Sequence, residues 1–254
     1  MTAQAAARRE RVGVLGGMGP LASAEFLRTI YEHGEGEREQ ELPVVMLYSD
    51  PTFPDRSESF LAGRPDALLA RLTAALGELE ALGVDRVVIC CVTLHHLLPR
   101  LPARLSGRVV SLVDVACDEL ERRERPHLLV CTAGTRAMRV FESHPRWERV
   151  RHLVRLPEAA DQQRVHDWIY GVLKRGGDRE AAVCFLRGLL ARYEVGALLA
   201  GCTDLHLLVR SLARPADGLG PVDSLDPLVL IAGRIASGAL HGPVELSLPP
   251  GVPA

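Results

Sequence analysis

One short motif occurs twice in the sequence, and this duplication constrains the fold more than any other feature. Residues 91–95 and 202–206 both read Cys-x-x-Leu-His, and each motif follows an apolar run. The two cysteines stand 111 residues apart in a chain of 254 residues. We therefore expect a duplicated structural unit whose two copies face each other, with one cysteine in each copy.

The paired cysteines also indicate a chemistry. Thiols on opposite faces of one carbon atom can act as base and acid: one removes a proton, and the other returns a proton to the opposite face, which inverts the centre. A free cysteine is more often a small buried hydrophobe, but the shared motif favours catalysis by Cys91 and Cys202. Cys90, Cys117 and Cys184 lack the pairing. We expect the first in strand core and the other two in helix core.

Apolar runs of strand length alternate with longer segments whose apolar residues recur every three or four positions, which is typical of an α/β protein with a mostly parallel sheet. The expected strands are residues 11–16, 43–49, 85–91, 109–113, 127–132, 151–156, 197–201 and 221–225. The expected helices are residues 21–34, 66–83, 115–124, 163–176 and 180–194. Prolines near the two motifs mark crossings between two lobes. We expect residues 11–100 plus 210–245 in the first lobe and residues 101–209 in the second.

Each motif cysteine closes an expected strand and precedes an expected helix. Ligands of open α/β sheets collect at the carboxyl ends of strands. The partial positive charge of a helix N-terminus lowers the pKa of a thiol placed there. We therefore expect Cys91 and Cys202 at one cleft, activated as thiolates without a metal.

The composition indicates a globular protein with a small-molecule partner. Hydrophobic residues make up 47% of the chain and charged residues 24%, which is ordinary for globular proteins. The net charge of −2 gives no electrostatic reason to expect nucleic acid or an anionic membrane surface as a partner. We see neither a signal peptide nor an apolar segment long enough to span a membrane. We therefore expect a cytoplasmic protein with reduced thiols.

The glycine-rich run VGVLGGMGP occupies residues 12–20, directly after the first expected strand. Glycine allows close approach of the backbone to a ligand, and exposed amides at a helix start can hold a carboxylate. Gly17-x-Gly19-x-x-Ala22 also satisfies a loose dinucleotide fingerprint, with Asp50 as the ribose partner. The adjoining Gly16 and the proline in a variable slot argue against that interpretation. A plain structural turn is a third interpretation.

Four segments in register carry a resemblance to a known family. They are LGGMGP at residues 15–20, PDR at 54–56, Cys-x-Thr-x-His at 91–95 and GCT followed by an acid at 201–204. With these motifs the chain resembles the cofactor-independent aspartate/glutamate racemase superfamily, and most closely its aspartate racemase branch. The resemblance implies an α/β fold of two pseudo-symmetric lobes, each a mostly parallel sheet flanked by helices. The active site lies between the lobes.

The resemblance implies a racemase of an acidic amino acid that uses two thiols and no pyridoxal phosphate or metal cofactor, and usually a homodimer. Cys91 and Cys202 take the catalytic positions. Arg56 matches an arginine that holds a substrate carboxylate, and Lys174 matches a lysine at the distal carboxylate. The other implied substrate-binding positions are Gly17, Met18, Gly19, Tyr48, Val92, Thr93, Thr135 and Thr203. By pattern alone, the arginine and the lysine would be solvated surface residues and the threonines helix caps.

The chain departs from the family pattern inside its first motif. The family reads Pro-Cys-Asn-Thr, whereas this chain reads Cys90-Cys91-Val92-Thr93. Asp204 also stands where glutamate is usual. An apolar side chain cannot replace a hydrogen bond to a buried polar group, which costs roughly 1–3 kcal/mol when left unpaired. The expected substrate is therefore an acidic amino acid of the aspartate or glutamate type, without insisting on free aspartate. A derivatised amino acid, or an acid without the amino group, is an alternative.

Three other functions stay open. Related superfamily members isomerise or decarboxylate small diacids with a similar cleft, and a catalytically impaired homologue would only bind its ligand. His95 and His206 each lie four residues after a motif cysteine, so a Cys2His2 zinc site is formally available. The alternative role of these histidines is to hydrogen-bond the neighbouring thiol or to pack in a helix.

Overall fold

The computed structural model describes residues 9–34, 38–215 and 220–240. Its seven strands within these ranges form two parallel sheets flanked by helices. The first sheet has the order β2-β1-β3, with β1 (Arg11–Gly16), β2 (Val44–Ser49) and β3 (Arg86–Ile89). The second has the order β5-β4-β6-β7, with β4 (His127–Val130), β5 (Val154–Arg155), β6 (Ala197–Ala200) and β7 (Asp223–Leu225). The expected α/β class with two sheet-based halves is confirmed.

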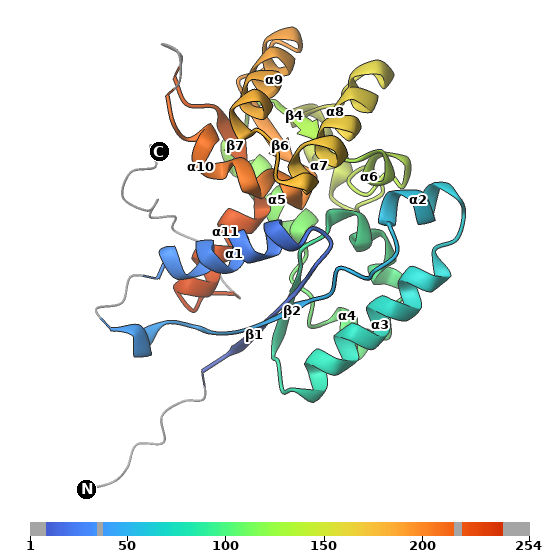
Figure 1. The fold of residues 1–254 in the computed structure, drawn as a ribbon, viewed down its shortest axis with the longest axis vertical. Coiled ribbons are helices and arrows are strands. Elements are labelled where there is room, and N and C mark those ends of the chain that lie inside the picture. Colours follow the sequence, from blue (N-terminus) through green and yellow to red (C-terminus); the bar gives the residue numbers. More distant parts are fainter. Residues whose placement is uncertain (1–8, 35–37, 216–219, 241–254) are drawn as a thin grey trace, which may run out of the picture.

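Helices connect the strands in both halves. The α-helices are α1 (Pro20–Glu32), α2 (Arg56–Leu61), α3 (Asp66–Ala81), α4 (Ala103–Ser106), α5 (Leu112–Arg123), α6 (Ala133–Ala137), α7 (Trp147–Val150), α8 (Ala159–Gly171), α9 (Arg179–Arg192), α10 (Val209–Leu212) and α11 (Pro227–Ala236). Short 3-10 helices are η1 (Glu39–Glu41), η2 (Val92–Arg100), η3 (Arg151–Leu153), η4 (Leu173–Arg175) and η5 (Thr203–Leu208). In Figure 1 the second sheet lies above and the first below, with α1 and α11 packed against each other between them.

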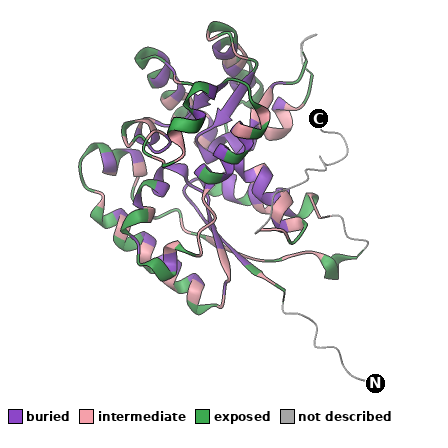
Figure 2. Ribbon diagram, turned by 180° about the vertical axis from the view of Figure 1, so that it is seen from behind, coloured by how far each residue is buried: buried purple, intermediate pink, exposed green. Residues whose placement is uncertain are grey.

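Both faces of strands β1, β3, β4 and β6 are buried, which explains why these strands read as continuous apolar runs. On β1, Val14 belongs to a central cluster with α1, while Leu15 packs in a second cluster with α3. On β6, Leu199 faces the central cluster and Leu198 packs in a third cluster with α8 and α9. In Figure 2 the buried residues accordingly run through the middle of the molecule, and the outer faces of the peripheral helices are exposed.

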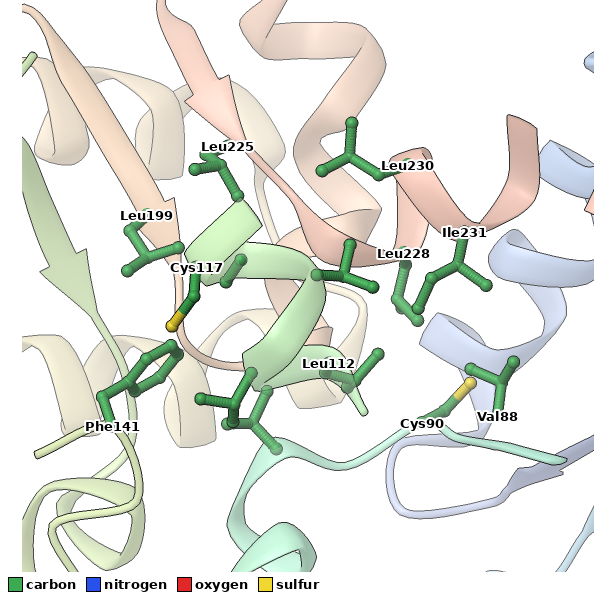
Figure 3. Close-up of a cluster of buried hydrophobic side chains, with 14 of the residues drawn as sticks. Val88, Cys90, Leu112, Cys117, Phe141, Leu199, Leu225, Leu228, Leu230 and Ile231 are labelled. Carbon is green, nitrogen blue, oxygen red and sulfur yellow. The ribbon is translucent and has the colours of Figure 1, made fainter. Parts of the chain in front are cut away.

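The central cluster joins the two halves into one core. Figure 3 shows Val88 of β3, Leu112 of α5, Leu199 of β6 and Leu228 of α11 converging on it. Each fully buried leucine contributes about 1.5–3 kcal/mol by leaving water. Truncating such a side chain to alanine costs about 2–5 kcal/mol because a cavity remains. The two halves are therefore held together by apolar packing through α5 and α11.

Two expected strands differ from the structure. Residues 109–113 make only one isolated parallel bridge, between Val109 and Val87, and then start α5. The helix begins there because the Ser111 side chain caps it by accepting a hydrogen bond from the Asp114 amide. The expected strand at 151–156 shrinks to two residues, since 3-10 helix η3 occupies its first half.

The expected lobe boundaries stay a prediction. β7 falls in the segment 210–245, which we expect in the first lobe, yet it pairs with β6 of the second sheet. α11 of the same segment packs on α1 and on α5. Among the described residues, no helix combines the length and the apolar character needed to cross a membrane.

Candidate active site

The two motif cysteines occupy equivalent places in the two sheets. Cys91 follows β3 by two residues, and Cys202 follows β6 by two residues. Each has an extended backbone and directly precedes a 3-10 helix, η2 or η5. Before Cys202 the chain needs glycine, because a Cβ on Gly201 would lie 2.6 Å from Leu129 Cδ1. The duplicated sequence thus produces the same strand-turn-helix geometry twice.

Cys91 and Cys202 line one pocket at the carboxyl ends of the central strands. The pocket holds about 260 Å³ of empty space, part of it open to solvent. Cys91 is 6% exposed and Cys202 is 7% exposed, so both thiols are nearly buried. The other lining residues come from both halves: Met18, Arg56, Ser57, Val92, Thr93, Thr132, Tyr170, Lys174, Thr203 and Asp204.

Arg56 brings a positive charge to the Cys91 side. It is the first residue of α2, which is capped by the Asp55 side chain. Its guanidinium donates to the carbonyl oxygens of Met18 at 2.9 Å and Pro54 at 3.1 Å. Burial works against its charge, but the acidic groups nearby, Cys91 first among them, raise the pKa of Arg56. Its charge is therefore available to an anion in the pocket.

Lys174 and Asp204 form an ion pair on the Cys202 side. Lys174 Nζ lies 2.7 Å from Asp204 Oδ2, and the same oxygen accepts a hydrogen bond from Cys202 Sγ at 3.5 Å. Asp204 is 1% exposed. Burial disfavours the lysine cation, yet the Asp204 charge, the Cys202 thiol and the hydrogen bond to Asp204 together raise the pKa of Lys174. The lysine stays charged and holds the carboxylate beside the thiol.

The environment of Cys202 differs from the expected thiolate. Burial, and then the neighbouring Asp204 carboxylate, raise the pKa of Cys202 well above its ordinary value, with Lys174 offsetting only part of the effect. The expectation of a thiol activated by a helix N-terminus is therefore wrong for Cys202. The element that follows it, η5, is a six-residue 3-10 helix. The Asp204 backbone amide in its first turn lowers the pKa of Cys202, but burial and the Asp204 carboxylate outweigh this effect.

A cluster of threonine hydroxyl groups lies at one side of the pocket. Thr93 Oγ1 lies 2.8 Å from Thr135 Oγ1 and 3.4 Å from Thr132 Oγ1. Thr93 and Thr132 line the pocket, whereas Thr135 supports them from behind. Thr203 lines the pocket and donates to the Cys90 carbonyl at 2.9 Å. This bond links the two motifs, because it joins the Cys202 turn to the residue before Cys91.

The glycine-rich run shapes the pocket mainly by making room. Gly17 has φ of 92°, and a Cβ there would lie 2.3 Å from the Asp50 backbone. Its amide donates to Ser23 Oγ at 3.0 Å, so it is engaged within the protein. A Cβ on Gly19 would lie 2.2 Å from Asp204 Oδ1. Met18 lines the pocket, while the two glycines are absent from its wall.

The structure directs the side chains of Tyr48, in β2, and Asp50, directly after β2, away from the places expected for them. Tyr48 is not part of the pocket wall; burial and then a hydrogen bond with Glu78 of α3 raise its pKa, so its hydroxyl group points toward that helix. Asp50, the candidate ribose partner, accepts a hydrogen bond from the Thr52 amide at 2.8 Å and pairs with Arg71. Its carboxylate is thus engaged away from the glycine-rich run.

The histidines of the two motifs turn away from the thiols. His95 Nδ1 bonds the Cys91 carbonyl at 3.1 Å, and its Nε2 accepts from the Leu112 amide at 3.1 Å. His206 bonds Asp226 and Thr29. Within residues 9–34, 38–215 and 220–240, no group of three or more His, Cys, Asp or Glu side chains is arranged to hold a metal ion. The candidate Cys2His2 zinc site does not form, because both imidazoles are committed elsewhere.

The other cysteines divide into buried and exposed positions. Cys90 and Cys117 are buried, as expected for core residues. Cys184 is exposed, so its assignment to helix core is wrong. It lies on the outer side of α9, next to Val183, which packs in the core.

Sequence reasoning missed four residues of the pocket wall as binding candidates. Ser57, Thr132, Tyr170 and Asp204 line the pocket and were not assigned to substrate binding. The signal for Asp204 was present, because it stands two residues after a catalytic candidate in the second motif. Tyr170 carries no motif; its hydroxyl donates to Asp55 Oδ2 at 2.8 Å and so joins α8 to the start of α2.

Comparisons with known proteins point in one direction. The broad specificity amino-acid racemase RacX of Bacillus subtilis (strain 168) is 23% identical over 138 residues, which cover 52% of this chain and 58% of RacX. The match therefore spans less than two thirds of that relative.

Solved structures share the fold at low sequence identity. An aspartate racemase from Picrophilus torridus has a TM-score of 0.73 and 21% identity, covering 91% of this chain and 99% of its own. A glutamate racemase from Francisella tularensis subsp. tularensis SCHU S4, in complex with D-glutamate, has a TM-score of 0.60 and 12% identity, covering 90% and 80%. A model of the family described as Asp/Glu/Hydantoin racemase matches residues 15–232, most of the chain. The chain therefore belongs to the Asp/Glu/hydantoin racemase family.

Proposed function

We propose that this protein is an amino acid racemase that inverts the α-carbon of an acidic substrate by proton transfer between two thiols. The observation that carries the proposal is the shared pocket, which Cys91 and Cys202 line from the two halves of the chain. The names of the family and of the racemases described above support the same activity. Because the two thiols serve as base and acid, the reaction needs no pyridoxal phosphate or metal.

Arg56 is the group best suited to hold a substrate carboxylate. Within the described residues it bonds only carbonyl oxygens and makes no ion pair, and its planar fork can bind a carboxylate with two parallel hydrogen bonds. The same charge stabilises the negative charge that develops beside the carboxylate when the α-proton leaves. Lys174 approaches the same Met18 carbonyl, at 3.4 Å, and thus lies near enough to act with Arg56 on an acidic substrate.

The two thiols start the reaction in different states. Cys202 donates its hydrogen to Asp204 and serves as the acid that returns a proton to the α-carbon. Cys91, near the Arg56 cation, serves as the base for the enantiomer that binds first. In the reverse direction the roles exchange, because inversion leaves the proton on the opposite sulfur.

The substrate we propose is an acidic amino acid of the aspartate or glutamate type. The positive charges of Arg56 and Lys174 favour a substrate with two carboxylates. Val92 lines the pocket and offers no hydrogen bond to the substrate amino group. A derivatised amino group is therefore compatible with this wall, and we include it among the substrates to be tested. By the family resemblance we also propose that the protein is cytoplasmic and forms a homodimer. Size-exclusion chromatography with light scattering tests the homodimer.

The experiment is an enantiomer-resolved assay of the full chain against both enantiomers of aspartate and glutamate, free and N-acylated, together with small unsaturated diacids. We expect conversion of at least one acidic amino acid between its enantiomers, and no conversion by a double variant, Cys91→Ser with Cys202→Ser. Turnover of a diacid without any racemisation would replace the proposal with an isomerase or decarboxylase. Binding without turnover of any substrate would indicate a binding homologue.

A further inference from the structure

Behind the Cys202 side of the pocket, one buried histidine connects three elements. His206 of η5 lies four residues after Cys202 and is completely buried. Its Nδ1 lies 2.6 Å from Asp226 Oδ2, and its Nε2 lies 2.9 Å from Thr29 Oγ1. Asp226 caps α11 and Thr29 lies on α1. The imidazole therefore joins the Cys202 turn to the two helices packed between the sheets.

The hydrogen-bond partners fix the orientation of this ring. Asp226 Oδ1 accepts from the Leu228 amide at 2.9 Å, which leaves Oδ2 to accept from His206. Nδ1 therefore carries the hydrogen that faces the carboxylate, and Nε2 meets the Thr29 hydroxyl. Phe26 packs edge-on against the ring, with the ring centroids 6.0 Å apart. Neither nitrogen is available to another ligand, and the ring is held on its edge as well as at both nitrogens.

The turn that His206 holds contains the chemical groups of the Cys202 side. Cys202, Thr203 and Asp204 all precede His206 within one short segment. Its helix, η5, is of the 3-10 type, whose hydrogen bonds have poorer geometry than those of an α-helix. Leu205 and Leu208 anchor the segment in the apolar core, but apolar contacts have no preferred direction. The directional bonds of His206 therefore act together with the Thr203 bond to Cys90 and the Lys174 ion pair with Asp204 in orienting this segment.

The histidine of the first motif acts by a different route. His95 bonds the carbonyl of Cys91 and receives the Leu112 amide at the start of α5. His206 instead bonds the side chain that caps α11. In each half the motif histidine thus ties the cysteine turn to the first turn of a central helix. Because the two ties share no residue, they can be broken one at a time.

We propose that His206 is a positioning residue: with Asp226 and Thr29 it directs the Cys202 thiol toward Asp204 and the pocket. Its relevance to catalysis rests on the proposed racemase function. The reactivity of the thiol, however, can be measured without any substrate. The proposal and the racemase function can therefore fail separately.

The test is the rate of alkylation of each cysteine by iodoacetamide in the full chain, followed by peptide mass spectrometry. Cys91 is the internal reference, because it lines the same pocket with nearly the same exposure. In His206→Gln we expect Cys202 to react at least about threefold faster relative to Cys91, because the histidine no longer holds the Cys202 segment in place. A threefold ratio corresponds to a free-energy change of about 0.65 kcal/mol. In His95→Gln we expect the ratio to move the opposite way. An unchanged ratio in His206→Gln, or a uniform acceleration of both thiols in that variant, would overturn the proposal.

A matched pair of substitutions at Thr29 covers the case in which the histidine variants fold poorly. Thr29→Val keeps the shape of the side chain and removes the hydroxyl, whereas Thr29→Ser keeps the hydroxyl. We expect the valine variant to change the Cys202 to Cys91 ratio in the same direction as His206→Gln, and the serine variant to restore it. Equal ratios in the two variants contradict the proposal.

Kinetics supply the second readout. With a substrate identified by the racemase assay, Thr29→Val should lower kcat by about fivefold or more with KM changed less than about twofold, because the thiol is misdirected while the carboxylate site is intact. An effect on KM alone overturns the positioning role. If no substrate is turned over by the native chain, the racemase proposal fails, and the alkylation ratio still decides the role of His206.

Discussion

The two halves of the molecule carry the same five-residue pattern, yet they build different surroundings for their cysteines. Beside Cys91 stands Arg56, a cation that bonds only carbonyl oxygens among the described residues. Beside Cys202 stands Asp204, whose charge is paired with Lys174. The first half is therefore prepared to receive an anion, and the second keeps its thiol protonated.

This difference teaches that the duplicated backbone and the chemistry of the site are separable. The repeated strand-turn-helix unit brings both thiols to one pocket. The two cations come from elements outside the repeat, because α2 supplies Arg56 and η4 supplies Lys174. Asp204 occupies a variable position inside the second motif, where the first motif has Thr93. The proposed two-thiol mechanism needs one base and one acid at the start of each turnover, and the unequal charges are suited to that distinction.

The largest expected effect follows from removing either thiol. Cys91→Ser and Cys202→Ser should each lower racemisation by about 10³-fold, because a hydroxyl group is a far weaker acid and base partner than a thiol. Chiral chromatography of the product measures the loss. Cys184→Ser is the matched control, since Cys184 is exposed on α9, and its rate should stay native. A single pocket variant with near-native activity would show that the two halves do not share the reaction.

The next effect tests the cation of the first half. Arg56→Gln should lower kcat/KM by roughly 10- to 100-fold, because a hydrogen bond to a charged group contributes about 1.5–3 kcal/mol. Arg56→Lys should recover only part of this, since lysine lacks the planar fork. Steady-state kinetics with the preferred substrate measure both. Arg64→Gln, at an exposed site shortly after α2, is the control. If Arg56→Gln and Arg64→Gln had equal kcat/KM values, the assignment of an anion-binding site to Arg56 would be contradicted.

The carboxylate of the second half is tested by Asp204→Asn. The Asp204 charge adds to burial in raising the pKa of Cys202, so its removal should lower that pKa and shift thiolate formation to lower pH. The pH dependence of Cys202 alkylation measures this shift. Asp167→Asn removes one charge at an exposed site on α8 and should leave the profile unchanged. A Cys202 profile that moves to higher pH, or stays in place, contradicts the role of Asp204.

The last prediction concerns stability rather than activity, and it tests the histidine of the first half. Burial lowers the pKa of His95 to about 4, below its ordinary value near 6.5. The unfolded chain therefore takes up the proton first, and roughly 3 kcal/mol of stability should be lost as the pH falls from about 6.5 toward 4. The His95→Gln variant should be less stable at pH 7, and its free energy of unfolding should fall less steeply between about pH 6.5 and pH 4. Urea unfolding at several pH values measures the pH dependence of the free energy of unfolding for the native chain and for the variant. The same pH dependence in both would contradict a buried neutral His95.

The sequence predicted the fold and the paired cysteines because both leave local patterns. Apolar runs define β1, β3, β4 and β6, and the repeated motif marks Cys91 and Cys202. The strand expected at residues 109–113 was wrong. The Val109-Val110 pair is typical of a strand, but the Ser111 side chain caps α5 and starts the helix there. Tyr48 packs against the cluster of α3 instead of lining the pocket, and strand alternation alone does not say which face α3 covers.

The electrostatic part of the site could not be predicted from local patterns. The contact of Lys174 with Asp204 joins residues 30 positions apart, and the contact of His206 with Thr29 joins residues 177 positions apart. Neither pairing follows from spacing. The raised pKa of Cys202 depends on burial and on Asp204 together, so the expected helix-terminus effect gave the wrong direction.

The most direct test of the central claim follows each pure enantiomer of the substrate in deuterated water during the first part of the reaction. If the two thiols act from opposite faces, the inverted product should carry one solvent deuterium at the α-carbon, while the remaining substrate keeps its original hydrogen. Exchange of the substrate pool at a rate equal to or faster than inversion would mean that one base serves both faces, which contradicts the two-thiol account.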